Sequence, residues 1–215
     1  PTAGIFTNTT HRGDFCVKWI SVFCGSSPGA QAAFSYAAHQ LGEELVKRGI
    51  GLVYGGGRVG LMGEISTAVI QAGGNVIGVI PEGLVRKEVA AVELTDLEVV
   101  PSMHERKARM VEISDGFIAL PGGLGTFEEI FEVLTWAQLG IHNHPCGFFN
   151  VNNYYDNLIT FLDHAQDEQF IKDEHRQMII IEEHPGRLLD RFLSYSPPIV
   201  DKAAWAKELA KKPKR

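Results

Sequence analysis

Residues 116–134 read GFIALPGGLGTFEEIFEVL and combine a strand, a tight turn and a helix in one short stretch. Residues 116–120 form an apolar run that ends at a proline and two glycines, which is typical of a buried strand. The remainder has apolar side chains at helical spacing: Phe127, Ile130, Phe131 and Leu134. One face of this helix can therefore pack on a sheet, as in a βα unit of a parallel sheet.

The same alternation of short aliphatic runs and longer helical segments continues on both sides, from Val17 onward. We expect strands at residues 19–24, 51–54, 75–80, 97–100, 116–120, 145–149 and 178–181. Two further helices have packing faces, formed by Phe34, Ala37, Ala38, Leu41 and Leu45 and by Leu158, Phe161 and Leu162. Right-handed crossovers then predict the α/β class, with a doubly wound, Rossmann-like parallel sheet flanked by helices. Ligands of such folds bind outside the carboxyl ends of the strands, so functional residues should follow strands.

The length of 215 residues fits a single domain with tails. With 45% hydrophobic and 21% charged residues, the composition is that of a globular protein rather than a disordered chain. We predict a polar N-terminal segment at residues 1–16, one Rossmann-like domain at residues 17–197 and a basic C-terminal tail at residues 198–215.

Charge, hydropathy and cysteine usage exclude several classes of partner. The net charge of -6 argues against broad binding to nucleic acid, and no apolar run approaches the roughly 20 residues of a membrane span. Cys16, Cys24 and Cys146 have no disulfide-framework spacing, and Cys24 ends an apolar run as a small core residue would. Residues 1–15 have no apolar stretch suited to export, so we expect a cytoplasmic protein with no membrane partner.

The first glycine-rich turn follows the expected strand at residues 51–54 and reads GGGRVGLMG over residues 55–63. Backbone N–H groups of Gly55, Gly56 and Gly57 can converge on an anion, because glycine permits positive φ and close approach. Residues 55–60 also match G-x-G-x-x-G, although the turn follows the second βα boundary rather than the first. A tight strand-to-helix turn without a ligand is the alternative.

The second glycine-rich turn, PGGLGTFEE at residues 121–129, concentrates three glycines, a hydroxyl and two carboxylates at one helix N-terminus. No G-K-[ST] follows, which excludes a Walker-type loop and leaves a cradle for one phosphate or a sugar. The alternative is a capping box with Thr126 as N-cap and Glu129 at the third helical position.

Between the turns, residues 101–110 (PSMHERKARM) form a predicted helix with Ser102 as N-cap. Its i, i+3, i+4, i+7 face carries Met103, Arg106, Lys107 and Met110. An unpaired charge is expensive to bury, so we expect Arg106 and Lys107 to meet an anion or carboxylate in a cleft. Long side chains reaching solvent are the alternative.

The motifs M-H-x-R-K at residues 103–107 and P-G-G-x-G-T-x-x-E at residues 121–129 resemble those of the LOG (Lonely Guy) family, cytokinin riboside 5'-monophosphate phosphoribohydrolases. The match covers residues 17–195 and favours this activity over the label "lysine decarboxylase-like" that such proteins have often carried. The resemblance implies hydrolysis of the N-glycosidic bond of N6-modified adenosine 5'-monophosphates, and AMP as a further substrate, to free base and ribose 5-phosphate. It also implies a homodimer whose neighbouring subunit completes the site, and no cofactor.

By the same resemblance, Arg106 and Glu129 are the catalytic pair. The implied substrate-binding residues are Glu88, Lys107, Gly123, Leu124, Gly125, Thr126, Phe127, Glu128 and Thr135. Met103 and the glycines at residues 55–57 are further candidates for substrate contact. Glycosidic cleavage passes through an oxocarbenium-like state, which a carboxylate such as Glu129 stabilises while it positions or deprotonates water. An arginine stays protonated, so Arg106 is suited to orienting Glu129 or binding substrate.

Other functions stay open on the residues alone. A nucleotide-binding module without hydrolase activity would keep both glycine turns and not need Glu129. An NAD-dependent oxidoreductase has only the glycine match at residues 55–60 in its favour, and a PLP-dependent decarboxylase would need Lys107 as its Schiff-base lysine. His142, His144 and Cys146 match no common zinc spacing, so we expect no metal.

Overall fold

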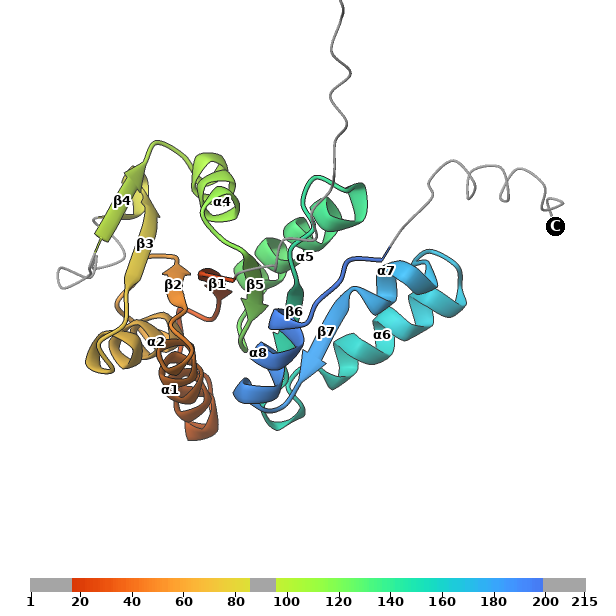
Figure 1. Ribbon diagram of the computed structural model, residues 1–215, viewed down its shortest axis with the longest axis horizontal. Coiled ribbons are helices and arrows are strands. Elements are labelled where there is room, and N and C mark those ends of the chain that lie inside the picture. Colours follow the sequence, from red (N-terminus) through yellow and green to blue (C-terminus); the bar gives the residue numbers. More distant parts are fainter. Residues whose placement is uncertain (1–16, 86–95, 199–215) are drawn as a thin grey trace, which may run out of the picture.

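The computed structural model describes residues 17–85 and 96–198 and shows an all-parallel sheet between two layers of helices (Figure 1). The strands are β1 (Trp19–Phe23), β2 (Gly51–Tyr54), β3 (Val76–Pro81), β4 (Asp96–Val100), β5 (Gly116–Ala119), β6 (Cys146–Phe149) and β7 (Ile179–Glu182). All the predicted strands are confirmed, each end within one residue of its expected position. The predicted fold class is therefore confirmed.

The strand order explains where a ligand can enter. Over the described residues the sheet has the order β4-β3-β2-β1-β5-β6-β7. The chain thus moves outward from β1 to one edge and then returns to pair β5 with the other side of β1, with Val22 opposite Ile118 and Phe23 opposite Ala119. The carboxyl ends of β1 and β5 form the topological switch point, where open α/β sheets bind ligands.

The two faces of the sheet carry different helices, as Figure 1 shows. One face is covered by α1 (Ala32–Lys47), α2 (Gly60–Gln71) and α8 (Pro185–Leu193). The other is covered by α4 (Met103–Glu112), α5 (Leu124–Leu139) and α6 (Asp156–Asp167). The short helices α3 (Glu82–Val85), η1 (Val151–Asn153) and α7 (Asp173–Gln177) lie in the connections.

Each face of the sheet has its own apolar core. Along β5 and the residue after it, Phe117 and Ala119 point into the core under α5, whereas Ile118 and Leu120 point into the core under α1. This period of two places apolar side chains on both faces, as expected for a buried parallel sheet. The predicted packing face of α1 is confirmed, because all five of its side chains are buried.

Two details of the helices differ from the sequence prediction. Phe161 was expected to pack on the sheet, but its side chain is 63% exposed. The packed side of α6 runs through Leu158, Ile159 and Leu162, and at about 100° per residue this side turns Phe161 outward. Helix α2 begins at Gly60, inside the stretch of residues 55–63 that was interpreted as a turn.

Some expectations fall outside the described residues or stay untested. Residues 1–16 and 199–215, and with them Cys16 and most of the expected tail, lie outside the described residues, as does Glu88. The division into segments 1–16, 17–197 and 198–215 therefore stays a prediction. Within the described residues, every helix is too short or too polar to span a bilayer.

Candidate active site

The centre of the site is a buried ion pair between Arg106 and Glu129. Arg106 lies on α4, which follows β4, and Glu129 lies on α5, which follows β5. Arg106 Nη1 donates to Glu129 Oε1 over 2.8 Å, and each side chain is only 11% exposed. The structure thus brings together the carboxylate and the guanidinium that the sequence placed on separate segments.

Three further contacts hold the Arg106 side chain. Its Nε donates to the carbonyl of Val79 within β3 over 3.0 Å, and Nη1 lies 3.3 Å from Met103 Sδ. The guanidinium also fills the space beside Gly55, where a Cβ atom would overlap Nη2 and come within 3.1 Å of Met62 Sδ. The glycine after β2 therefore makes room for the arginine of α4.

Burial and charge act in opposite directions on Glu129. Burial raises the pKa of this carboxyl, and the positive charge and hydrogen bond of Arg106 lower it. The nearby charge of Glu128 adds to the rise, so the pKa of Glu129 lies above its ordinary value. A carboxylate with a raised pKa is a stronger base at neutral pH than an ordinary glutamate.

Lys107, the next residue on α4, meets two other carboxylates of α5. Its Nζ lies 2.5 Å from Glu128 Oε1 and 3.0 Å from Glu132 Oε2, and its side chain is 12% exposed. Burial lowers the pKa of Lys107, but the hydrogen bonds of the two carboxylates outweigh this effect and raise it. Arg106 and Lys107 were expected to meet an anion or a carboxylate, and each of them is paired with carboxylates of α5. A raised pKa is the opposite of what a Schiff-base lysine needs, which weighs against the decarboxylase alternative.

The capping box, which was the alternative interpretation of the second glycine turn, does not form. Helix α5 begins at Leu124 with Gly123 as N-cap, and Glu129 bonds to Arg106 instead of a helix terminus. The helix begins before Thr126, because the Thr126 side chain is buried inside the first turn and packs over Gly122. A Cβ atom at Gly122 would overlap the Thr126 hydroxyl. Gly123, the N-cap, and Gly125 have open space on the side where a Cβ atom would lie.

The remaining candidates at this turn differ in exposure. Leu124 is 86% exposed, and Glu128 is exposed beside Lys107. Phe127 is half-buried, with its ring edge-on to Tyr155 at 6.3 Å between centroids. The turn therefore exposes an apolar side chain and a carboxylate to solvent, while the aromatic ring of Phe127 anchors the helix.

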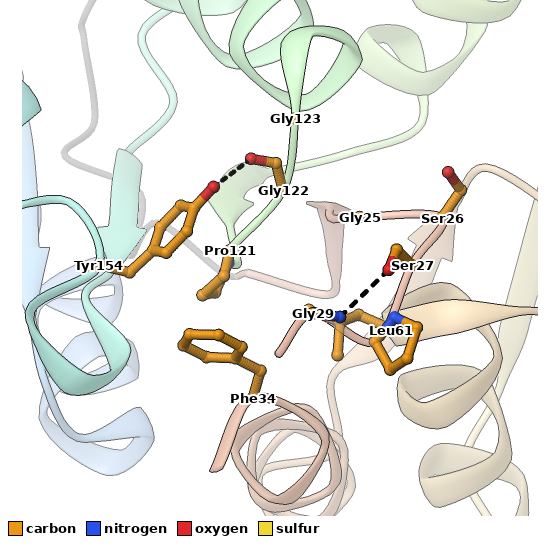
Figure 2. A pocket seen from close by; sticks show the side chains of 11 residues that line it. Gly25, Ser26, Ser27, Gly29, Phe34, Leu61, Pro121, Gly122, Gly123 and Tyr154 are labelled. Atoms are coloured by element: carbon orange, nitrogen blue, oxygen red, sulfur yellow. Dashed lines mark hydrogen bonds between the residues drawn. The ribbon is translucent and has the colours of Figure 1, made fainter. Parts of the chain in front are cut away.

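A cavity of about 310 Å³ opens at the switch point, beside the second glycine turn (Figure 2). Its walls are residues 25–29 after β1, residues 121–123 after β5, Leu61, and the rings of Phe34 and Tyr154. Residues 25–29 and Tyr154 were not among the predicted site residues. The signal for the first of these was present, because Gly25, Ser26 and Ser27 directly follow the first strand of the sheet.

The loop after β1 connects the two glycine turns. The Gly25 N–H donates to the Pro121 carbonyl, and the Leu61 N–H donates to the Gly25 carbonyl, each over 3.0 Å. At Gly60, with φ +63, a Cβ atom would overlap the backbone of Ser26. The loop and both turns thus form one packed unit at the carboxyl ends of the strands.

The glycines at residues 55–57 are buried, unlike those of the second turn. Gly56, with φ +77, faces Ile80 and Leu97, and Gly55 faces Arg106. Packing within the protein therefore accounts for Gly55 and Gly60 of the G-x-G-x-x-G pattern, which weakens the observation behind the NAD alternative.

Thr135 and Met103 complete the candidate residues. Thr135 is exposed six residues after Glu129, roughly 9 Å further along α5, and its hydroxyl donates to the Phe131 carbonyl. It lines a small hollow with His175, so a single chain does not bring it to the ion pair. Met103 is 42% exposed and contacts Arg106 through sulfur.

The histidines near β6 are part of the core rather than a metal centre. His142 is buried, and its Nε2 lies 2.9 Å from the Val133 carbonyl. Cys146 is a buried free thiol whose pKa burial raises strongly, and the same holds for Cys24. In the part of the chain that the structure describes, no three His, Cys, Asp or Glu residues are placed to hold a metal ion.

The sheet order, the cavity at the switch point and the buried ion pair define a Rossmann-like α/β protein with a charged site at the carboxyl ends of its strands. Residues 62–192 match the family described as "Possible lysine decarboxylase". The chain belongs to this family, and within it to the LOG proteins, with which it is about half identical over most of its length.

Two plant relatives illustrate this similarity. The chain is 51% identical over 185 residues to the "Probable cytokinin riboside 5'-monophosphate phosphoribohydrolase LOGL5" of Oryza sativa subsp. japonica, covering 86% of this chain and 75% of the relative. It is 49% identical over 191 residues to the "Cytokinin riboside 5'-monophosphate phosphoribohydrolase LOG7" of Arabidopsis thaliana, covering 87% and 88%.

The fold is also similar to solved structures of lower sequence identity. The molybdenum cofactor binding protein from Rippkaea orientalis superposes with a TM-score of 0.63 at 23% identity, covering 83% of this chain and 97% of that one. The molybdenum cofactor carrier protein from Chlamydomonas reinhardtii gives 0.63 at 18% identity, covering 84% and 100%. At these identities the likeness concerns the fold alone.

Proposed function

We propose that this chain hydrolyses the N-glycosidic bond of cytokinin riboside 5'-monophosphates, and of AMP, to the free base and ribose 5-phosphate. The observation that carries this proposal is the buried Arg106–Glu129 pair beside an exposed glycine turn. The names of the relatives, which are about half identical over most of the chain, point to the same reaction.

Glu129 is the proposed base of the reaction. Its raised pKa suits it to accept a proton from water, and its negative charge stabilises the cationic sugar of an oxocarbenium-like transition state. Arg106 keeps this carboxylate in one position, because its guanidinium is itself fixed. It donates to the Val79 carbonyl and fits into the space beside Gly55. A fixed carboxylate needs no reorganisation when the positive charge develops.

The second glycine turn is the proposed phosphate site. The N–H groups at the start of α5 and the positive end of the helix dipole attract an anion. Gly123 and Gly125 have open space beside them, so a phosphate can approach the backbone closely. Binding the remote phosphate fixes the sugar at the reacting carboxylate.

The pH dependence of turnover tests the role of Glu129. Because its pKa is raised and its ionised form is the active one, kcat should fall with decreasing pH through a value above the ordinary glutamate pKa of about 4.3. The kcat profile is the informative one, since titration of the free substrate's phosphate affects kcat/KM only. An acid limb at or below the ordinary glutamate value would contradict the assigned role.

We also propose a homodimer in which Thr135 reaches the site of the neighbouring copy. The support is its place: Thr135 is exposed, away from the ion pair of its own chain, and Leu139 and Ile141 nearby are 51% and 64% exposed. Light scattering should give twice the chain mass of 23.6 kDa, and Leu139→Lys should shift it toward the monomer. A monomeric wild type would refute the dimer.

The two free thiols, Cys24 and Cys146, support a cytoplasmic location as a further part of the proposal.

Product analysis tests the proposed reaction. Purified protein is incubated with isopentenyladenosine monophosphate, with AMP and with the two ribosides that lack phosphate, and released base is quantified by chromatography. We expect free base and ribose 5-phosphate from the monophosphates and little from the ribosides. AMP binding with no base released over hours would favour the nucleotide-binding module instead.

A further inference from the structure

Three successive carbonyls lead into the second glycine turn, and each accepts a hydrogen bond from a different part of the fold. The Leu120 carbonyl accepts from the Tyr155 hydroxyl over 2.6 Å, and the Pro121 carbonyl accepts from the Gly25 N–H over 3.0 Å. The Gly122 carbonyl accepts from the Tyr154 hydroxyl over 2.6 Å (Figure 2). Hydrogen bonds thus fix the backbone at each of the three residues that precede the N-cap of α5.

The bond to the Gly122 carbonyl acts directly on the first residue of the helix N-terminus. In a trans peptide the C=O of one residue and the N–H of the next belong to one rigid plane and point in opposite directions. Holding the Gly122 carbonyl toward Tyr154 therefore also sets the direction of the Gly123 N–H, the N-cap donor of α5. Hydrogen bonding to the carbonyl also polarises this N–H.

The position of the Tyr154 hydroxyl is itself well fixed. Its ring packs edge-on to Phe34 at 5.7 Å and to Tyr155 at 4.9 Å between centroids. The segment is anchored by the buried Asn150, whose side chain accepts from the Tyr155 N–H and donates to Asp156, each over 2.8 Å. Tyr154 is 40% exposed, so the ring lines the cavity while its hydroxyl reaches the turn.

We propose that Tyr154 is a positioning residue for the phosphate of the substrate, acting through the Gly122–Gly123 peptide. This inference rests on the proposed function in one respect, namely that the glycine turn binds the phosphate. Tyr154 touches the turn and not the reacting bond, so its loss should weaken phosphate binding and leave the chemical step almost unchanged.

The neighbouring tyrosine supplies a matched control. Tyr155→Phe removes the same kind of hydroxyl-to-carbonyl bond two residues upstream. The peptide that begins at the Leu120 carbonyl ends at Pro121, which has no N–H to reorient. Tyr155 is fully buried, so this variant should lower the melting temperature more than Tyr154→Phe does, without a selective effect on phosphate.

Calorimetric titration with ribose 5-phosphate and with adenosine tests the proposal without turnover. For Tyr154→Phe we expect the Kd of ribose 5-phosphate to rise about threefold to tenfold and that of adenosine to change less than twofold. KM for AMP should rise in parallel, with kcat within twofold of wild type. For Tyr155→Phe both Kd values should stay within twofold.

The outcomes separate this inference from the proposed function. An unchanged Kd of ribose 5-phosphate in Tyr154→Phe, an equal loss for both ligands, or a wild type that binds no ribose 5-phosphate would overturn the positioning role. If the wild type releases no base from any monophosphate, the proposed function fails. The selective loss of ribose 5-phosphate binding in Tyr154→Phe would still support the positioning role.

Discussion

Glu129→Gln is expected to lower kcat/KM for isopentenyladenosine monophosphate by about 10³-fold. The amide has no negative charge to stabilise a cationic sugar and no basic oxygen to take a proton from water. It keeps the shape of the side chain and an oxygen that can still accept from Arg106 Nη1. The loss should therefore appear in kcat, with KM changed much less.

The same substitution should change stability little, because two effects oppose each other. A carboxyl whose pKa is raised in the folded state stabilises the fold below its unfolded pKa, and this contribution is lost as pH rises through the folded pKa. Glutamine does not ionise, so the variant avoids the stability that Glu129 loses when it ionises. It also leaves the buried Arg106 without an anionic partner, which lowers stability. We expect the melting temperature at pH 7 to move by no more than about 5 °C.

Glu112→Gln is the matched control for this experiment. Glu112 is an exposed carboxylate at the end of α4 and pairs with Arg109. The variant removes the same charge outside the site, and its kcat/KM should stay within twofold of wild type. Full activity in Glu129→Gln, or an equal loss in both variants, would remove Glu129 from the mechanism.

Gly55→Ala is expected to lower kcat/KM by about 10²-fold while the protein stays folded. The new methyl group would overlap Arg106 Nη2 and press on Met62 Sδ. The guanidinium is the far end of a flexible side chain, so it can move aside at small cost to stability. A displacement of about 1 Å between catalytic groups suffices for a loss of this size.

A second glycine provides the control for this effect. At Gly186 on α8 a Cβ atom would meet the nearest atom, Glu44 Oε1, at an ordinary contact distance of 3.5 Å. Gly186→Ala should therefore retain wild-type activity. Thermal melting and kcat/KM are measured for both variants. The assignment fails if Gly55→Ala is fully active, or if its activity falls only in proportion to the unfolded fraction.

Much of the fold and part of the site could be predicted from local patterns. The strands end within one residue of their predicted positions, because each apolar run is bounded by turn residues. The cap of α4 is also local: Ser102 accepts a hydrogen bond from the Glu105 N–H, as the spacing predicted. Arg106 and Lys107 were expected to meet an anion or a carboxylate, because two charges on an apolar face need partners.

Other features depend on which strand ends lie side by side. The pairing of Arg106 with Glu129 was implied only by the family resemblance, and no local pattern assigned Glu128 and Glu132 to Lys107. The capping box at Thr126 was a sound local pattern, yet packing of the threonine over Gly122 moved the start of the helix.

By itself, the sequence determined the class of fold, the positions of its strands and the two motifs that carry the chemistry, because hydrophobic period and glycine spacing act within a few residues of the chain. Only the tertiary structure decided the partners of Lys107, the room that Gly55 leaves for Arg106 and the contact of Tyr154 with Gly122, 32 residues apart. These depend on the order β2-β1-β5-β6, which brings the loops after separate strands to one edge of the sheet.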